Sequence, residues 1–479
     1  MLDILWLVGS HKNNVVTESS KELFWEDTFR NIIPDGNIRK VFLKIIYNNL
    51  TDNECIIYRQ DIIKDFLDNR QLMEDILSFI EKADVFCDEY NNAIKTTKNI
   101  LNDTRNSETL SGAISSLQIT SFFFKRITHL ILKLKESFSL YNIKSYGLLS
   151  IKTRLAELED KIYNTQVINI ISDLENIHID ETNASFYLHL NENGRIGEIN
   201  LNNVYSSFLN DKKSVTRLFK RKRNIQFSAN VRYSEETNKI ISQEILNISD
   251  IIYDITRSII IEFGALKNGI CFYKGGIQYI DYLIGKKIPL CFPTFSSGTK
   301  IEGLYDLNLI SRNLTNIVPN DFEFDEYLKG CLIKGPNSSG KTVYMRSIAV
   351  SFFIAQSGLP VPAKRAQYSI AEKIYSLYSH SETSDSMTPV MGRFECEVKE
   401  LSDIVFSAKP NSMIIFNEMF QTTKYGEGAE GLFHIFNYLS HKNIRWIAVT
   451  HIEELFSLYK DDISVEKILI EKYHALNYK

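Results

Sequence analysis

Glycine and proline are scarce in this chain: its 479 residues include 21 glycines and 9 prolines, about half of the usual share. Residues that break helices and form tight turns are therefore few, which argues against a turn-rich β-sandwich or barrel and favours long helices. Apolar residues make up 44% of the chain and charged residues 24%, which is typical of folded globular proteins. At this length we expect roughly two to four packed units.

Three further absences narrow the class of protein. The six cysteines contain no Cys-x-x-Cys pair, so neither a disulfide framework nor a zinc ribbon is expected. The formal net charge of −4 excludes a uniformly basic nucleic-acid binder but not a local basic patch. No apolar run approaches the ~18 residues of a membrane-spanning helix. The N-terminus contains Asp3 and has no basic lead, unlike a signal peptide, so we expect a cytoplasmic protein with no membrane partner.

Hydrophobic periodicity indicates that the first half of the chain is mainly helical. From about residue 37 to 111, apolar residues recur every three or four positions in successive stripes, as in a helical core. The segment Asn49–Asn53 is typical of a turn or N-cap before the second of these helices. Residues 112–172 and about 236–267 predict two much longer helices, which would form an arm that runs out and back.

Between the two long helices the sequence changes character. Residues 186–190 and 196–201 are short β-like runs, and Asn193-Gly194 between them is a strong hairpin signal. The same stretch holds a basic cluster, which consists of Lys212, Lys213, Arg217, Lys220, Arg221, Lys222 and Arg223. Such a cluster could neutralise several phosphates of DNA, and the alternative is a solvated helix face. We treat it as the candidate DNA contact.

From about residue 288 the chain alternates between extended apolar runs and helical stretches. The runs are 288–292, 330–334, 412–416 and 446–450, and the helical stretches are 341–356, 395–408 and 428–442. This alternation predicts a parallel or mixed sheet with crossover helices. The predicted fold class of the whole chain is therefore multidomain, with α-helical and α/β parts.

The most specific motif is G-x-x-x-x-G-K-[ST], which residues 335–342 match at every required position. A predicted strand leads into the motif and a predicted helix leaves it, which is the context in which such a loop binds phosphates. Lys341 would reach the β- and γ-phosphates of a nucleotide, and the Thr342 hydroxyl would bind Mg²⁺. The predicted phosphate-binding residues are Gly335, Pro336, Asn337, Ser338, Ser339, Gly340, Lys341 and Thr342.

Two further strand ends carry candidate catalytic residues. The apolar run 412–416 ends in Asn417-Glu418, and Glu418 suits the general base that orients or deprotonates water. An Asp would normally precede it; Asn417 offers Mg²⁺ an oxygen without the negative charge, so nucleotide binding should survive better than hydrolysis. A later run ends in Thr450-His451, which makes His451 a candidate γ-phosphate sensor.

Several of these segments together resemble the MutS mismatch-repair family. The similar segments are Gly335–Arg346, Val361–Ala363, Phe394-x-x-Glu397, Asn417-Glu418, Thr450-His451 and, in the helical core, 37–84. The resemblance implies ATP as the nucleotide and an ABC-type ATPase domain that works as a homodimer or heterodimer with composite sites. It also implies that Ile317 and Val318 pack on the adenine, and that Gly392, Phe394 and Glu397 form the signature loop.

On this interpretation the chain has four parts. Residues 1–36 are an N-terminal segment, 37–111 a helical core, 112–267 lever helices with a clamp at about 180–232, and 268–479 the P-loop ATPase domain. The mismatch-reading and connector domains of the family have no counterpart, and Gly392 stands where the family has its signature serine.

Two functions stay open at this point. One is a MutS-like, weakly active ATPase that closes a clamp around DNA, of the repair or recombination type. The other is a nucleotide-binding switch or scaffold that hydrolyses little or no ATP and binds a protein partner instead of DNA. Asn417 and Gly392 favour the second function, because both replace residues that the family uses in hydrolysis.

Overall fold

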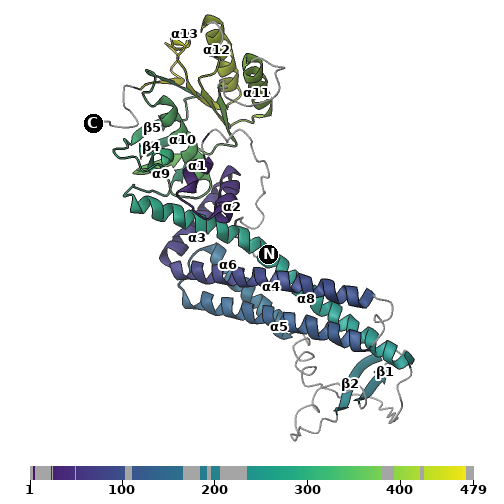
Figure 1. Cartoon of the computed structure of the whole chain (residues 1–479). Helices are drawn as coiled ribbons and strands as arrows, with labels where there is room; N and C mark the ends of the chain where they lie inside the picture. The colour runs from purple at the N-terminus through teal and green to yellow at the C-terminus, as the bar shows by residue number, and fades with distance from the viewer. Residues whose placement is uncertain are drawn as a thin grey trace. The chain divides into compact units, whose positions relative to one another are not determined.

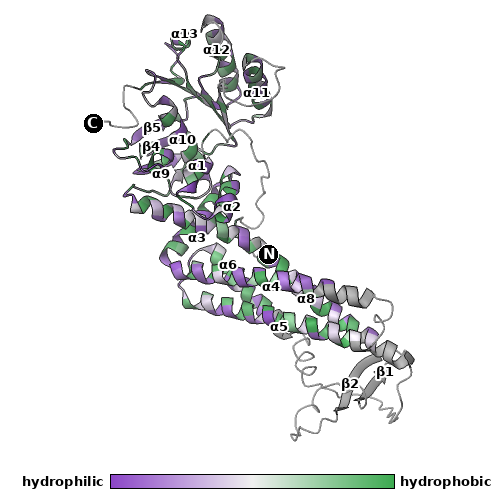
Figure 2. Cartoon of the chain, in the orientation of Figure 1, coloured by the Kyte–Doolittle hydropathy of each residue, from purple (hydrophilic) through white to green (hydrophobic). Residues whose placement is uncertain are grey.

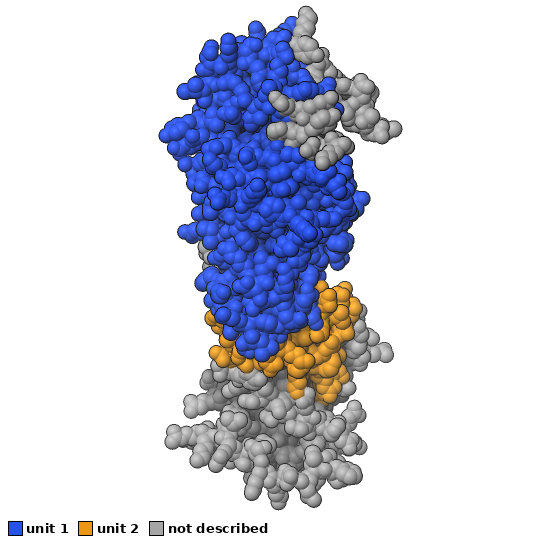
Figure 3. Space-filling model, turned by 90° about the vertical axis from the view of Figure 1, so that its left-hand side faces the viewer, with its two compact units in different colours: residues 1–78, 137–152, 262–479 blue, residues 79–136, 153–261 orange. Residues whose placement is uncertain are grey.

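The computed structural model describes residues 4–5, 23, 25–48, 50–102, 110–164, 184–190, 196–204, 235–379, 393–420 and 425–470. The chain divides into two compact units, which Figure 3 shows in different colours. Unit 1 comprises residues 1–78, 137–152 and 262–479, and unit 2 comprises residues 79–136 and 153–261. Each unit is therefore built from segments that are far apart in the sequence.

Helices form the first part of unit 1 (Figure 1). They include α1 (Trp25–Arg30), α2 (Gly36–Tyr47), α3 (Asn53–Asp68), the start of α4 (Arg70–Asn102) and the end of α8 (Glu235–Gly285). Asp35 caps α2 by accepting hydrogen bonds from two backbone N–H groups. Asp52 caps α3 by accepting one from Glu54 N at 3.0 Å. The N-cap that the segment Asn49–Asn53 predicts is thus confirmed, and Asp52 is the capping residue.

Helix α8 extends well beyond the predicted end at residue 267 and continues to Gly285. Glycine is required at two positions of this helix, because another side chain packs closely against each of them. A Cβ atom on Gly275 would approach the Phe42 ring to 2.7 Å, and one on Gly269 would approach the Ile4 side chain to 2.5 Å. Phe42 is fully buried, and its ring stacks on Phe272 of α8 with centroids 5.7 Å apart.

The long helix predicted over residues 112–172 is wrong in one respect, because the structure divides it. Helix α5 ends at Leu140 and α6 begins at Tyr146 (α5, Leu110–Leu140; α6, Tyr146–Asn164). The buried carboxylate of Asp65 accepts hydrogen bonds from the backbone N–H groups of Lys144 at 3.0 Å and Ser145 at 2.6 Å. This partner lies about 80 residues away in the sequence, so local periodicity did not reveal the break.

Unit 2 contains the remaining parts of α4, α5, α6 and α8, which pack through aromatic and small polar side chains. The Phe123 ring of α5 lies 5.5 Å from Phe86 and 5.2 Å from Tyr90 of α4. Ser116 of α5 and Ser249 of α8 are hydrogen-bonded through their hydroxyl groups at 2.9 Å. Figure 2 shows hydrophilic and hydrophobic residues mixed along α4 and α5, as expected of helices with one buried face.

The strand pair of unit 2 consists of β1 (Ala184–Leu190) and β2 (Ile196–Val204), which are antiparallel. This pairing confirms the hairpin that the sequence predicts. The turn at Asn193-Gly194 and the basic cluster at 212–223 lie outside the described residues. Within the described part of the chain, no helix is both long and apolar enough to cross a membrane.

The second part of unit 1 contains a five-stranded sheet in which all neighbouring strands are parallel. Its order is β11 (Val465–Leu469), β6 (Gly330–Lys334), β10 (Arg445–Val449), β9 (Met413–Asn417) and β8 (Ile374–Tyr378). The helices between these strands, seen beside the sheet in Figure 1, are α10 (Lys341–Gln356), α11 (Arg393–Ser407), α12 (Tyr425–His441) and α13 (Glu453–Leu458). The predicted mixed α/β fold with a parallel sheet is confirmed.

Close packing under this sheet explains why β6 begins with glycine. A Cβ atom on Gly330 would lie only 2.0 Å from the ring of Trp446 on the neighbouring strand. That ring is fully buried and stacks on Phe436 of α12 with centroids 4.1 Å apart. The first strand of the phosphate motif is therefore fixed in register against the centre of the sheet.

A four-stranded mixed sheet lies in the same unit. Its order is β3 (Thr294–Phe295), β7 (Arg365–Tyr368), β4 (Thr299–Leu304) and β5 (Asn320–Phe324), and the short helix α9 (Leu307–Ser311) follows β4. The strand predicted at residues 288–292 is wrong: only Cys291 is paired, in an isolated bridge with Val361. The run follows α8 closely, and Ile288 N still donates to Leu283 O of that helix at 3.0 Å.

Candidate nucleotide site

The loop between β6 and α10 has the backbone geometry of a phosphate loop. Ser338 and Gly340 both have left-handed backbones, with φ of 63° and 99°. Such conformations turn successive N–H groups towards one side, and α10 adds the positive end of its dipole. The first glycine is also required for space, because a Cβ atom on Gly335 would lie 2.3 Å from the carbonyl oxygen of Ile470.

Lys341, the first residue of α10, is 4% exposed. Its Nζ donates hydrogen bonds to the carbonyl oxygens of Gly335 and Pro336, both at 3.0 Å. Burial lowers the pKa of Lys341 below its ordinary value, and the nearby Glu418 carboxylate opposes that shift. The ammonium group is therefore held inside the loop, where an anionic ligand would stabilise its charge.

Two hydroxyl groups complete the phosphate side of the site. Ser339 is 1% exposed, and its Oγ has no hydrogen-bond partner among the described residues. A buried hydroxyl without a partner is costly, and a phosphate oxygen would satisfy it. Thr342 donates from its Oγ1 to Asn417 Oδ1 at 3.2 Å, so the two predicted Mg²⁺ ligands lie side by side.

These residues fit a nucleotide with Mg²⁺. Backbone N–H groups, an ammonium group and a hydroxyl are donors suited to phosphate, and Mg²⁺ takes a few protein oxygens together with phosphate and water. Among the described residues, His, Cys, Asp and Glu side chains form no group of three or more that could hold a metal ion. A Mg²⁺ ion here would thus depend on Thr342 and Asn417 and on the phosphates themselves.

The sheet brings Glu418 and His451 together, because β9 and β10 are neighbours and their ends align at Asn417 and Val449. His451 Nε2 lies 2.9 Å from Glu418 Oε1, and both side chains are about one-third exposed. Glu418 has a left-handed backbone, with φ of 57°, and its N–H donates to Val449 O at 2.9 Å. The pair can hold a water molecule and accept its proton.

Glu397 lies in the stretch that the sequence predicts to be helical, on the buried face of α11, and is 1% exposed. The signature-loop role that the resemblance implies for it stays a prediction. Its Oε1 accepts a hydrogen bond from Ser379 Oγ, and its Oε2 accepts one from Phe420 N, both at 2.9 Å. Phe394 is 43% exposed, and its ring lies 5.2 Å from that of Phe420. Gly392 lies outside the described residues.

Strand β5 is tied to α10, the helix that follows the phosphate loop. Tyr344 OH donates to the carbonyl oxygen of Asp321 at 2.7 Å, and Ile317 and Val318, just upstream, are half-buried. The contact with adenine that the resemblance implies for these two residues stays a prediction. A buried ion pair between Arg346 and Asp306, at 3.1 Å, also anchors α10.

Sequence reasoning missed two residues that support this site. Ser379 follows β8, which was not predicted, although the β-branched and aromatic residues of Ile374-Tyr-Ser-Leu-Tyr378 are a strand signal. Asp306 caps α9 through Leu309 N at 2.8 Å, and an Asp before a short apolar run is an N-cap signal. Their roles towards the site come from tertiary contacts, which neither signal reveals.

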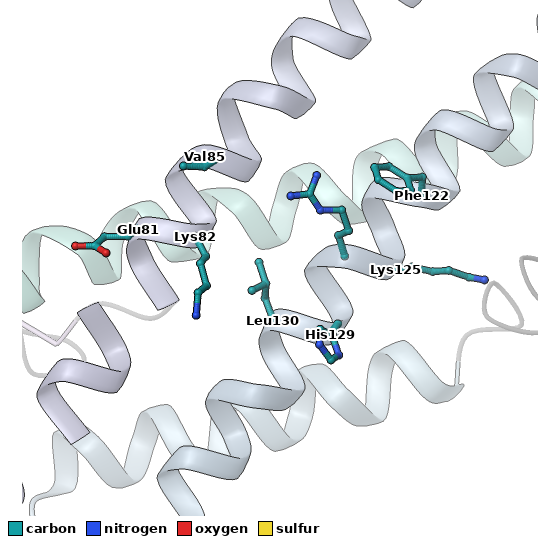
Figure 4. Close-up of a pocket in the computed structure, with 8 residues that line it drawn as sticks. Glu81, Lys82, Val85, Phe122, Lys125, His129 and Leu130 are labelled. Atoms are coloured by element: carbon teal, nitrogen blue, oxygen red, sulfur yellow. The ribbon is translucent and has the colours of Figure 1, made fainter. Parts of the chain in front are cut away.

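A cavity of about 570 Å³ lies elsewhere, on α4 and α5 in unit 2 (Figure 4). It is lined by Glu81, Lys82, Val85, Phe122, Lys125, Arg126, His129 and Leu130. Arg126 pairs with Glu89 and lies over the rings of Phe86 and Phe122. None of the nucleotide motifs contributes to the lining of this cavity.

The parallel sheet, the left-handed phosphate loop with its buried lysine, and the Glu–His pair at adjacent strand ends define the class of P-loop NTPase folds. Comparison with known families agrees with that class. The model for MutS domain V matches residues 331–476, and the model for the MutS2 N-terminal domain matches residues 51–285. The chain belongs to the MutS family.

Individual relatives have modest identity. The chain is 34% identical over 148 residues to the DNA mismatch repair protein MutS of Caldicellulosiruptor saccharolyticus, and 26% identical over 259 residues to that of Desulfovibrio desulfuricans. It is 26% identical over 236 residues to the endonuclease MutS2 of Streptococcus uberis. These matches cover 30%, 50% and 48% of the chain but only 17%, 28% and 29% of the relatives.

Proposed function

We propose that this protein is a MutS-like ATPase that uses its nucleotide state to close a clamp around double-stranded DNA. The observation that supports this most directly is the meeting of three elements at one end of the sheet. They are the phosphate loop with Lys341, the Thr342–Asn417 hydrogen bond and the Glu418–His451 pair. Membership of the MutS family supports a role on DNA, of the repair or recombination type.

Residues of the phosphate loop would bind ATP and Mg²⁺. Lys341 already lies within the loop, and an ammonium group in that position neutralises phosphate charge. Ser339 Oγ, buried and without a partner among the described residues, would donate to a phosphate oxygen. Thr342 and Asn417 would hold Mg²⁺ through their side-chain oxygens. When bound, Mg·ATP supplies the phosphoanhydride bond whose hydrolysis separates two states of the protein.

Glu418 and His451 are the proposed catalytic residues. A carboxylate at a strand end next to the phosphate loop can orient water and accept its proton, which is the role we assign to Glu418. The His451 ring, 2.9 Å away, fixes the orientation of that carboxylate and would sense the terminal phosphate. Hydrolysis should be slow, because Asn417 brings no negative charge to the cation.

DNA binding is proposed for the basic cluster at residues 212–223, which lies in the sequence between β2 and α8. Seven basic residues within this short stretch can neutralise several phosphates without any base-specific contact. With a chain net charge of −4, DNA affinity would depend on such a local patch. Following the family, we propose a homodimer or heterodimer with composite ATP sites, in which Gly392 would weaken activation by the partner.

A nucleotide-dependent switch with little or no hydrolysis is the second candidate function. It is favoured by the Thr342–Asn417 contact, in which an amide rather than a carboxylate faces the proposed Mg²⁺ position. In that case the arms could hold a protein partner instead of DNA.

Steady-state phosphate release separates the two functions. We expect the wild type to release phosphate faster than Lys341→Ala and Glu418→Ala, and we expect Lys341→Ala alone to lose affinity for a fluorescent ATP analogue. Wild-type release no faster than that of both variants, with nucleotide still bound, would reject the ATPase and leave the switch. If Lys341→Ala binds the ATP analogue and releases phosphate as the wild type does, both the ATPase and the nucleotide switch are rejected.

DNA affinity measured against salt tests the clamp. Replacing Lys220 and Arg221 by Ala should lower the slope of log K against log salt by about 2, because each lost phosphate contact releases one counterion fewer. Lys40 and Lys44, two exposed lysines of α2, provide a matched pair whose replacement should leave the slope unchanged. An unchanged slope in the first variant would remove the cluster from the DNA contact.

A further inference from the structure

The carboxylate of Glu397 lies on the inner face of α11, between exposed neighbours. Phe394 and Val398 on the same helix are 43% and 40% exposed, whereas Glu397 is 1% exposed. Buried carboxylates are costly unless hydrogen bonds satisfy them. Within the described residues, both of its hydrogen bonds come from uncharged donors, namely the Ser379 hydroxyl and the Phe420 backbone N–H. Each carboxylate oxygen of Glu397 thus accepts one of these two hydrogen bonds.

The two donors belong to the ends of neighbouring strands. Ser379 follows β8 and Phe420 lies three residues after the end of β9, and the strands pair at Tyr378 and Asn417. The backbone N–H of Ser379 also donates to Asn417 O at 3.1 Å. One side chain of α11 therefore bridges the strand end that carries Glu418 to the strand beside it.

The segment after β9 needs such support, because its backbone conformation is unfavourable. Glu418 and Phe420 have φ values of 57° and 60°, and non-glycine residues occupy this region rarely. Glu418 is held on one side by its N–H, which donates to Val449 O at 2.9 Å. Phe420 is held on the other side by Glu397, and its ring packs on Phe394 of the same helix.

We infer that Glu397 is a positioning residue, through which α11 fixes the loop that presents Glu418 to the phosphate site. The inference rests on the proposed function, since it concerns the placement of the proposed general base. Glu397 itself touches neither the phosphate loop nor His451 among the contacts of the described residues. Any displacement of α11 would move Phe420 and hence Glu418.

Substitutions at position 397 separate geometry from charge. Glu397→Gln can keep both contacts, since its amide oxygen can accept from Phe420 N while its NH₂ group donates to Ser379 Oγ. Glu397→Asp keeps the charge but is shorter by one methylene, and Glu397→Ala removes both acceptors. Ser379→Ala removes one of the two donors. Glu400, an exposed residue of the same helix, provides the control Glu400→Ala.

Three measurements on the full chain form the test: affinity for a fluorescent ATP analogue, phosphate release at saturating ATP, and amide hydrogen exchange of peptides that contain Phe420. We expect Glu397→Ala and Glu397→Asp to lower the maximal rate about 10- to 100-fold, as is typical when a group that orients a functional residue is lost. Nucleotide affinity should change less than about twofold, and exchange around Phe420 should accelerate. Glu397→Gln and Glu400→Ala should resemble the wild type, with Ser379→Ala intermediate.

Two results would overturn the inference. One is unchanged exchange around Phe420 in Glu397→Asp and Ser379→Ala, and the other is a loss in Glu397→Gln as large as in Glu397→Asp. If Glu397→Ala does not fold, the Asp, Gln and Ser379→Ala variants decide. Absence of phosphate release in the wild type would contradict the proposed ATPase, but the exchange measurements would still support or reject the role of Glu397.

Discussion

The phosphate loop between β6 and α10 takes its shape from its own backbone, whereas the loop that carries Glu418 takes its shape from distant residues. In the first loop, left-handed Ser338 and Gly340 turn the chain and Lys341 donates back to the carbonyl oxygens of the loop itself. In the second, the supporting groups are Val449 on β10 and Glu397 on α11. The first half of the site is therefore a local motif, and the second is a product of tertiary packing.

The largest effect on the free energy of unfolding is expected from loss of the Asp306–Arg346 ion pair, which anchors the helix after the phosphate loop. Asp306 pairs with Arg346 of α10, with side chains 6% and 9% exposed, and also caps α9. Asp306→Ala leaves a buried guanidinium without this partner, so the free energy of unfolding should fall by about 3–5 kcal/mol. Urea denaturation measures the change, with exposed Asp325→Ala as the control. A loss no larger than the control's would show that the ion pair does not support α10.

A smaller loss of unfolding free energy is expected when the turn of the phosphate loop is disturbed at Gly335. In Gly335→Ala the added methyl group meets the backbone oxygen of Ile470, which has little freedom to move away. The unfolding free energy should fall by about 1–3 kcal/mol, and affinity for a fluorescent ATP analogue should fall with it. Gly431 of α12 has no atom within 4 Å of the corresponding position, so Gly431→Ala should be neutral or stabilising. Equal effects of the two variants would contradict a steric need for Gly335.

Asn417 connects the phosphate loop to the loop that carries Glu418, because it accepts a hydrogen bond from Thr342 and directly precedes Glu418. Its replacement therefore tests how the two loops work together. Asn417→Asp would place a carboxylate 3.2 Å from the Thr342 hydroxyl, where it would bind Mg²⁺ more tightly than an amide does. We expect the half-saturating Mg²⁺ concentration for phosphate release to fall about tenfold, which corresponds to about 1.4 kcal/mol. Asn91→Asp, at an exposed position of α4, should change nothing. An unaltered Mg²⁺ dependence would reject Asn417 as a metal ligand.

The smallest effect concerns pH. Burial lowers the pKa of Lys341 in the folded protein, so its charge is a destabilising contribution that is fully present below the folded pKa. That contribution disappears as pH rises from the folded pKa towards the ordinary value of 10.5. In this alkaline window the melting temperature of the wild type should therefore rise relative to Lys341→Met. A constant difference across the window would indicate that the lysine is not desolvated.

This contrast also explains which parts of the molecule could be predicted. The match at residues 335–342 predicted both the loop and α10, whose observed bounds, Lys341–Gln356, are those expected, because local spacing determines both. Glu418 and His451 were each predicted at the end of a strand, whereas their contact at 2.9 Å was seen only in the structure, where the two strands are neighbours. The stretch that contains Glu397 was predicted as a helix, but nothing in its own neighbourhood indicates that Ser379 and Phe420 lie opposite that side chain.

The errors in the predicted fold also arise where a distant residue decides the local conformation. The break between α5 and α6 depends on Asp65, which lies far away in the sequence, and the periodicity of the segment itself is helical. The run at 288–292 is apolar enough for a strand but finds only one bridge, at Cys291. Local patterns thus predicted elements well and failed where a distant partner decides the local conformation.

The pairing of β11 with β6 has a consequence for synthesis of the chain. β11 is the last strand among the described residues, yet it pairs with the strand that opens the phosphate motif, and Ile470 N donates to Lys334 O at 2.7 Å beside Gly335. A nascent chain that has not yet reached Val465 contains the whole motif but lacks one wall of the loop. Competence for nucleotide should therefore arise only after the ribosome has released Val465–Leu469.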